Sequence, residues 1–123
     1  MKFWKRRKLR SPVRTSDARK SDRKSDADAR TATKEHFARF IATRVGVEAF
    51  VEPATHVTSA TMVLIANTGE WTRRKVPSLE EGWKLARQLE IPVYDVNQVG
   101  YPARMREWNS KKREQWRKNQ DQV

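Results

Sequence analysis

One short apolar run sets the strongest limit on how this chain can fold. Residues 61–66 (TMVLIA) are its one uninterrupted apolar stretch, in a sequence in which 34% of the residues are charged. A short run that is rich in β-branched residues and bounded by polar ones is typical of a strand buried on both faces. We therefore expect this strand to lie at the centre of the core.

Two further segments have the pattern of strands that pair with this central run. In residues 47–52, Val, Ala and Val alternate with Glu, Phe and Glu, which predicts a half-buried strand. Residues 67–70 are a short connection that contains a glycine, and residues 71–76 follow as a return strand. Because basic side chains commonly protect an unpaired strand edge, we expect residues 71–76 at the edge of the sheet.

Two local signals predict where helices begin. Thr33 has the position of an N-cap for a helix over residues 34–45, whose apolar residues recur at helical spacing. Ser78 and Glu81 form an S-x-x-E capping box, in which each side chain bonds to the backbone N–H of the other residue. The second signal predicts a helix directly after residues 71–76.

The predicted elements give the fold class and the domain limits. Adding a strand at residues 91–96 and a last helix at 102–118 gives the order α-β-β-β-α-β-α. This order predicts an α+β fold with a small mixed four-stranded sheet and helices mainly on one face. We expect the α+β domain at residues 33–108 and a basic helical extension at 109–123. For residues 1–32 we expect a disordered basic tail, because this segment holds too few large apolar side chains to offset the entropy of ordering.

Positive charge gathers at the two ends of the sequence. The net charge is +12, of which residues 1–30 contribute +8, residues 31–100 zero and residues 101–123 +4. Charge placed in this way favours arms that bind a polyanion over an evenly charged globular surface. The partner we expect is a nucleic acid or a ribonucleoprotein, and an anionic membrane surface or an acidic protein is also open.

Three basic segments and three tryptophans are the candidate contacts. The basic groups lie in the N-terminal arm, in the predicted edge strand and in the last helix: Lys2, Lys5, Arg6, Arg7, Lys8, Arg10, Arg73, Arg74, Lys75, Lys111, Lys112, Arg113, Arg117 and Lys118. Interleaved aromatics could stack on bases beside these charges, and the candidates are Trp4, Trp71 and Trp116.

Each candidate contact also has a structural interpretation. The basic residues at 73–75 are equally what a solvated edge strand carries. Trp108 lies three residues after Met105, so it is assigned to the core, whereas Trp116 has no apolar neighbours and is assigned to a partner.

The sequence contains no motif that would support catalysis. It has no cysteine, and its four glycines form no phosphate-binding loop. His36, expected on the exposed side of its helix, and His56, expected in a loop, lack ligands at metal spacing. We therefore expect no catalytic residue, no metal and no cofactor. Without an 18-residue apolar run or a secretory signal, we expect a cytoplasmic protein.

Two resemblances bear on fold and function. Residues 46–53 (GVEAFVEP), 69–74 (GEWTRR), 91–96 (IPVYDV) and 100–106 (GYPARMR) resemble a group of small uncharacterised actinobacterial proteins, sometimes labelled oxidoreductases. Residues 49–54, 78–86 and 94–96 are more remotely similar to the 18 kDa accessory subunit family of respiratory complex I. That family is a non-catalytic structural component, and its tryptophan-rich loop before the helix is absent here.

Two functions follow as predictions. The first is a non-enzymatic basic protein that binds nucleic acid or a ribonucleoprotein through its charged ends. The alternative, implied by the second resemblance, is a structural accessory subunit of a respiratory or redox complex without its own catalytic site. The oligomeric state and the strand order stay open.

Overall fold

A computed structural model describes residues 25–121 of the 123-residue chain. The chain divides into two units, residues 1–32 and residues 33–123. Of the first unit the structure describes residues 25–32, which are helical and exposed. Disorder was predicted for residues 1–32; of these, residues 25–32 are helical, and residues 1–24 lie outside the described residues.

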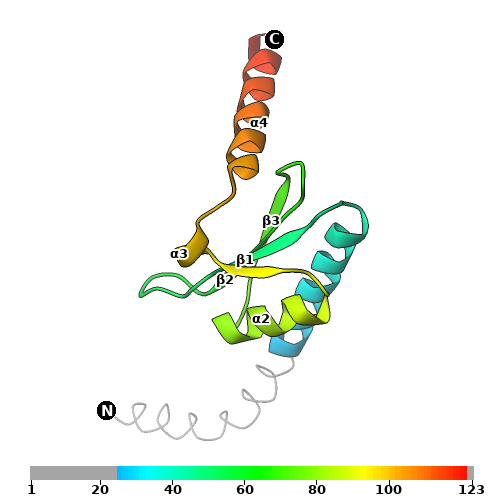
Figure 1. The fold of residues 1–123 in the computed structure, drawn as a ribbon, viewed down its shortest axis with the longest axis vertical. Helices are drawn as coiled ribbons and strands as arrows, with labels where there is room; N and C mark the ends of the chain where they lie inside the picture. The colour runs from blue at the N-terminus through cyan, green and yellow to red at the C-terminus, as the bar shows by residue number, and fades with distance from the viewer. Residues whose placement is uncertain (1–24, 122–123) are drawn as a thin grey trace, which may run out of the picture. The chain divides into compact units, whose positions relative to one another are not determined.

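The second unit is built on a four-stranded mixed sheet (Figure 1). Its strands are β1 (Glu48–Glu52), β2 (Thr61–Ile65), β3 (Trp71–Lys75) and β4 (Val93–Asp95), arranged in the order β3-β2-β1-β4. β2 runs antiparallel to both β1 and β3, and β4 runs parallel to β1. The predicted α+β fold is confirmed, and β3 lies at the edge as expected.

Besides the helix that begins in the first unit, this unit contains three helices. They are α2 (Leu79–Gln88), α3 (Val96–Val99) and α4 (Ala103–Asp121). The α2 N-cap is the predicted one, because the Ser78 hydroxyl accepts a hydrogen bond from the Glu81 backbone N–H at 3.1 Å. α4 runs without a break through the boundary expected at residue 108.

The predicted start of the first helix is wrong. Residues 25–42 are helical, so Thr33 lies inside the helix and is not its N-cap. Alanines at positions 27, 29 and 32 explain the earlier start, because alanine has the highest helix propensity. α3 also forms where no helix was predicted, and there the Asp95 carboxylate accepts a hydrogen bond from the Asn97 N–H at 2.8 Å.

One face of the sheet carries the main core. Ala49, Val51, Met62 and Leu64 are fully buried there, beneath residues 33–42 and α2. Phe37 supplies the largest buried side chain from the helix. Burial of a side chain of this size stabilises the fold by about 1.5–3 kcal/mol. This face places residues 36–44, the end of the helix and the turn after it, beside the edge strand β3.

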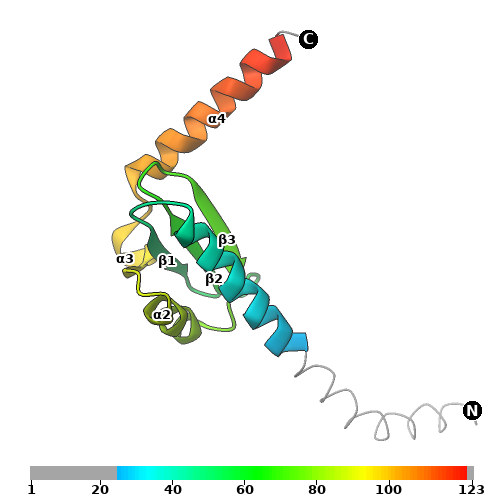
Figure 2. The ribbon, with the colours of Figure 1, turned by 90° about the vertical axis from the view of Figure 1, so that its right-hand side faces the viewer.

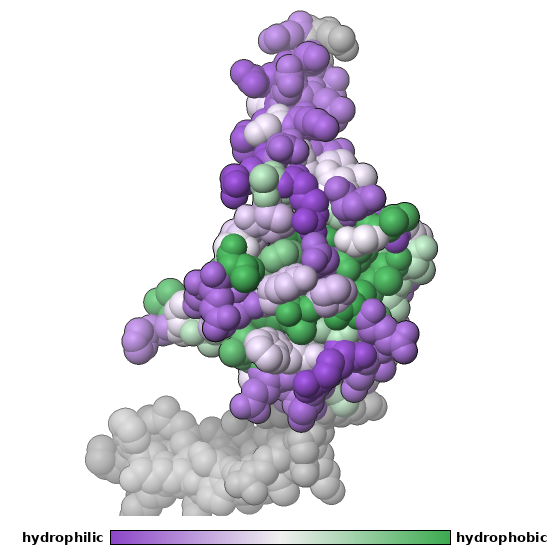
Figure 3. Space-filling model, in the orientation of Figure 1, coloured by the Kyte–Doolittle hydropathy of each residue, from purple (hydrophilic) through white to green (hydrophobic). Residues whose placement is uncertain are grey.

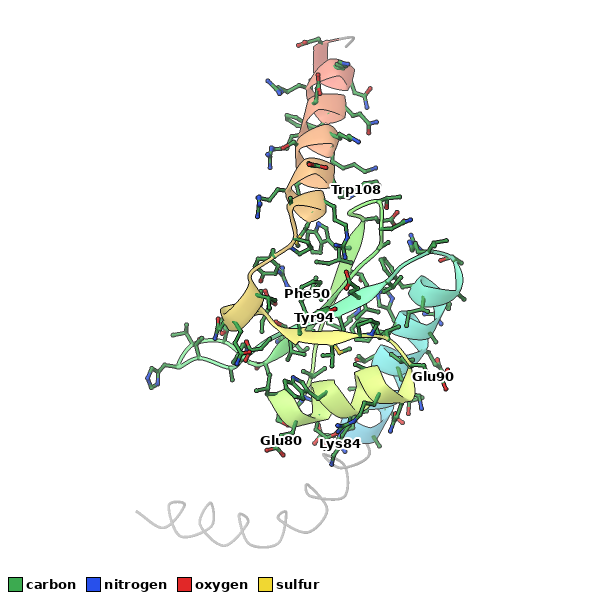
Figure 4. The ribbon with its side chains drawn as sticks, in the orientation of Figure 1. Phe50, Glu80, Lys84, Glu90, Tyr94 and Trp108 are labelled. Carbon is green, nitrogen blue, oxygen red and sulfur yellow. The ribbon has the colours of Figure 1, made fainter. Side chains whose placement is uncertain are left out.

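The opposite face holds a smaller apolar cluster that α4 covers. Phe50, Val63 and Ile65 are buried there with Met105 of α4. Figure 4 shows Phe50 and Tyr94 together on this face, and their ring centroids lie 5.4 Å apart. Figures 1 and 2 show that α4 then continues well beyond the sheet. The first turns of α4 therefore belong to the core, whereas its later turns do not.

Candidate polyanion-binding surface

A tight contact fixes the start of α4 on the β2–β3 turn. Gly69 is buried at φ +94°, and a Cβ built on it would lie 2.0 Å from the carbonyl oxygen of Arg104. The Arg104 guanidinium donates to the Ala66 carbonyl at 2.9 Å and to the Glu48 carboxylate at 2.6 Å. The same carboxylate raises the pKa of Tyr94 through its interaction with the phenol. The position of α4 on the sheet is thus defined by several independent contacts.

Arg73, the first basic residue of β3, is used within the fold. Its guanidinium donates to both carboxylate oxygens of Glu52, at 2.9 and 3.1 Å. It also lies over the Trp71 ring, 5.2 Å from the ring centroid. A bidentate pair of this kind satisfies the geometry that a phosphate would otherwise use. Arg73 is therefore paired with a residue of β1, two strands away, although it is partly exposed.

The other two basic residues of β3 differ from each other. Arg74 donates to the Arg73 carbonyl at 2.8 Å and lies 3.5 Å from Nδ1 of His36. Lys75 is exposed and has no ion-pair partner within residues 25–121. The predicted basic strand face therefore offers one uncommitted cation.

Trp71 is also engaged within the fold. Its indole N–H donates to the side-chain oxygen of Asn109 at 2.8 Å, and its ring packs against the apolar cluster beneath α4. Half-buried in this way, Trp71 joins β3 to α4. Its ring has one side against the protein, so it does not project as a stacking platform.

The later turns of α4 carry the uncommitted charge. All residues from 110 to 121 are exposed, and Figure 3 shows this part of α4 covered by hydrophilic side chains. Within these residues the structure contains one ion pair, Lys118–Glu114 at 3.9 Å, with both side chains largely exposed. Four further cations surround it without an ion pair: Lys111, Lys112, Arg113 and Arg117.

An aromatic stripe runs along the same helix. Trp108, Lys112 and Trp116 follow one another at four-residue spacing and therefore share one face. The Lys112 ammonium lies 4.8 Å from the centroid of the Trp108 ring, and Trp108 itself is half-buried (Figure 4). Trp116 is 63% exposed. A large aromatic side chain and a group of cations therefore lie together on the later turns of α4.

The N-terminal candidates cannot be placed on this surface. The basic residues of the arm and its tryptophan all precede residue 25, outside the described part of the chain: Lys2, Trp4, Lys5, Arg6, Arg7, Lys8 and Arg10. Their role as polyanion contacts stays a prediction.

Sequence analysis missed a hollow between the first helix and β3. Its lining includes His36, Arg39, Arg44 and Thr72, and its volume is about 430 Å³. His36 is half-buried, with Nε2 2.7 Å from the Thr72 hydroxyl, so the expectation that it lies on the exposed side of the helix is wrong. The signal that was missed is the position of His36 in the helix. Phe37 faces the core, so the adjacent His36 lies at the margin of that face, toward the sheet edge.

The described residues show neither a metal cluster nor a membrane span. No three His, Cys, Asp or Glu side chains gather within residues 25–121. No helix in the same range is long and apolar enough to cross a membrane.

Comparisons with known proteins return no relative. Neither a family model, nor a curated protein, nor a solved structure matches this chain. Function is therefore inferred from the geometry and charge of this chain alone.

Proposed function

We propose that this protein is a non-enzymatic nucleic-acid-binding protein whose main contact is the later part of α4. The observation that supports it is the difference in commitment among the basic groups. Lys111, Lys112, Arg113 and Arg117 are exposed and without an ion pair among residues 25–121, and Trp116 projects beside them. A cationic helix with an exposed aromatic ring suits single-stranded nucleic acid, because the cations neutralise phosphates and the ring stacks on a base.

The structure also favours a contact without sequence reading. Lysines act as point charges on phosphates, and stacking accepts every base. We therefore propose a sequence-tolerant interaction, such as that of a protein bound to RNA or to a ribonucleoprotein in the cytoplasm.

The salt dependence of binding tests this proposal. A variant with Lys111, Lys112, Arg113 and Arg117 replaced by glutamine is compared with the unchanged full chain on a fluorescent single-stranded RNA. Loss of four phosphate contacts should reduce the slope of log affinity against log salt by about 3. A control variant replaces Arg30, Lys34, Lys84 and Arg87 by glutamine, four exposed residues elsewhere, and removes the same charge.

The control separates position from net charge. Equal slopes for the two variants would show that α4 has no special role, and no binding of the full chain at low salt would contradict the proposal itself. The accessory-subunit alternative predicts a different outcome, in which the full chain co-purifies with a respiratory complex and RNA binding is absent.

A further inference from the structure

The hollow between residues 36–44 and β3 contains groups that the α4 surface does not use. It opens between the helix and the edge strand, on the sheet face opposite α4. Hydroxyl groups of Thr43 and Thr72 line it, together with the Phe40 ring. At about 430 Å³ it has room for a ligand of several heavy atoms.

Positive charge exceeds negative charge around this hollow. Arg39 and Arg44 line it, and Arg74 lies beside His36 at its margin. Its one acidic lining residue is Glu70, which accepts from the Arg44 Nε at 3.0 Å. Arg44 also lies over the Phe40 ring at 4.4 Å, so this arginine is fully engaged. Two cations, Arg39 and Arg74, are left without a carboxylate among residues 25–121.

His36 joins these cations to the hydroxyl groups. A guanidinium can only donate, so Nδ1 of His36 is the acceptor that faces Arg74. Nε2 of His36 then carries the proton and donates it to the Thr72 hydroxyl. Burial lowers the pKa of His36 from 6.5, and the positive charges of Arg74, Arg39 and Arg44 lower it further. The imidazole therefore lies beside three arginines, of which Arg44 is paired with Glu70 and the other two have no carboxylate partner among residues 25–121.

We propose that this hollow binds a phosphate group, held by Arg39 and Arg74 with His36 and Thr72 at its base. A phosphate monoester carries about −1.5 to −2 charge at neutral pH, which matches two cations without a carboxylate partner better than a single carboxylate does. The planar donor fork of arginine fits phosphate oxygens. A protonated His36 adds a further donor to the bound anion. The phosphate belongs either to a small phosphorylated molecule or to the end of a nucleic acid.

The two histidines of the chain allow a direct test by NMR. His36 lies in the hollow, whereas His56 is exposed in the loop between β1 and β2 and serves as an internal reference. Inorganic phosphate is added to the full chain at constant pH and ionic strength, balanced with chloride. We expect a saturable shift of the His36 imidazole toward its protonated position, while the His56 signals do not move.

Matched variants show whether the arginines hold the anion. Arg39→Gln and Arg74→Gln should each weaken phosphate binding by about tenfold or more, as expected for loss of a hydrogen bond to a charged group. Arg87→Gln on α2 makes the same charge change on an exposed residue elsewhere and should leave the titration unchanged. Backbone amide spectra establish that each variant is folded. Equal shifts of both histidines, or an unchanged titration in Arg39→Gln, would overturn the proposal.

Two oligonucleotides then identify the source of the phosphate. RNAs of one sequence, with and without a 5′-phosphate, are added to the chain that carries the four α4 glutamines, so that α4 contributes little. A His36 shift with the 5′-phosphorylated RNA and none with the unphosphorylated RNA assigns the hollow to a nucleic-acid end. A shift with inorganic phosphate and with neither RNA assigns it to a small phosphorylated molecule. Because the phosphate titration does not involve α4, its result is independent of the proposed RNA contact.

Discussion

The two basic segments of the second unit, on β3 and on α4, look alike in the sequence. In the structure they differ in how many of their cations are engaged by other groups of the protein. On β3, Arg73 forms a bidentate pair with Glu52, and Arg74 lies against His36. On α4, the cations beyond residue 110 are exposed, and one of them has an ion-pair partner, Glu114, within the described residues. The same residue types stabilise the fold in one place and are available to a partner in the other.

This difference shows what decides whether a cation is available. A strand edge lies beside other strands, so its side chains meet carboxylates from sequence-distant positions such as Glu52. A helix that leaves the sheet meets only its own residues three and four positions away. Availability therefore depends on tertiary position, and a count of basic residues does not report it.

The strongest test replaces the same number of cations in each segment. Changing Lys111, Lys112 and Arg113 to glutamine should lower affinity for single-stranded RNA on the order of fiftyfold at about 150 mM salt. Changing Arg73, Arg74 and Lys75 to glutamine should lower it about fourfold, because one of the three is uncommitted. Fluorescence anisotropy measures both. Equal losses would remove the distinction between β3 and α4.

A second test compares a tryptophan from each segment. Trp116→Ala should lower RNA affinity about thirtyfold, the middle of the range for one stacked base, and leave the midpoint of urea unfolding unchanged. Trp71→Ala should leave RNA affinity unchanged and destabilise the fold, because it removes a half-buried ring and the hydrogen bond to Asn109. We expect it to lower the free energy of unfolding by about 2–4 kcal/mol. An affinity loss in folded Trp71→Ala as large as that in Trp116→Ala would contradict this division.

A third change should give β3 a further cation without an ion-pair partner, as α4 has. Glu52→Gln removes the carboxylate that holds Arg73 and leaves an exposed guanidinium beside Lys75. RNA affinity should rise about fourfold, the value expected for one added phosphate contact. The pair is partly exposed, so the free energy of unfolding should fall by about 1 kcal/mol. Arg73→Gln is the control, and it should not raise the affinity.

The smallest effect concerns pH, and it probes Arg74. The pKa of His36 is lowered in the folded state, so below about pH 6.5 the unfolded chain binds more protons at this residue than the folded chain. The free energy of unfolding therefore falls as the pH drops through this range and is fully retained above it. Urea unfolding at pH 7.5 and at pH 5.5 should show a smaller decrease for Arg74→Gln than for the unchanged chain. The same decrease in both would mean that Arg74 does not act on His36.

The fold was largely predictable because its signals are local. The alternation in residues 47–52, the apolar run around β2 and the Ser78 cap each report a nearby physical requirement, and each element formed where it was expected. The early start of the first helix was missed because exposed alanines leave no apolar stripe. α3 was missed because a four-residue helix has no periodicity to detect.

The candidate site was less predictable, since it depends on contacts between distant residues. The pairing of Arg73 with Glu52 spans 21 positions, and that of Trp71 with Asn109 spans 38. No spacing rule connects such positions before the strand order is known. The exposed state of Trp116 was predictable, because its surroundings in the helix are polar throughout. The hollow at His36 required both the helix position and the edge position of β3.

The tight contact between Gly69 and Arg104 has a consequence for where a bound RNA would lie relative to the sheet. It fixes the direction in which α4 leaves the sheet, and residues 110–121 then extend about 18 Å farther at 1.5 Å per residue. A strand of RNA held at Trp116 would therefore lie away from the sheet, and β3 would keep its outer edge accessible. The protein would then act as a spacer, able to hold RNA at one end while another molecule adds to the sheet edge at the other.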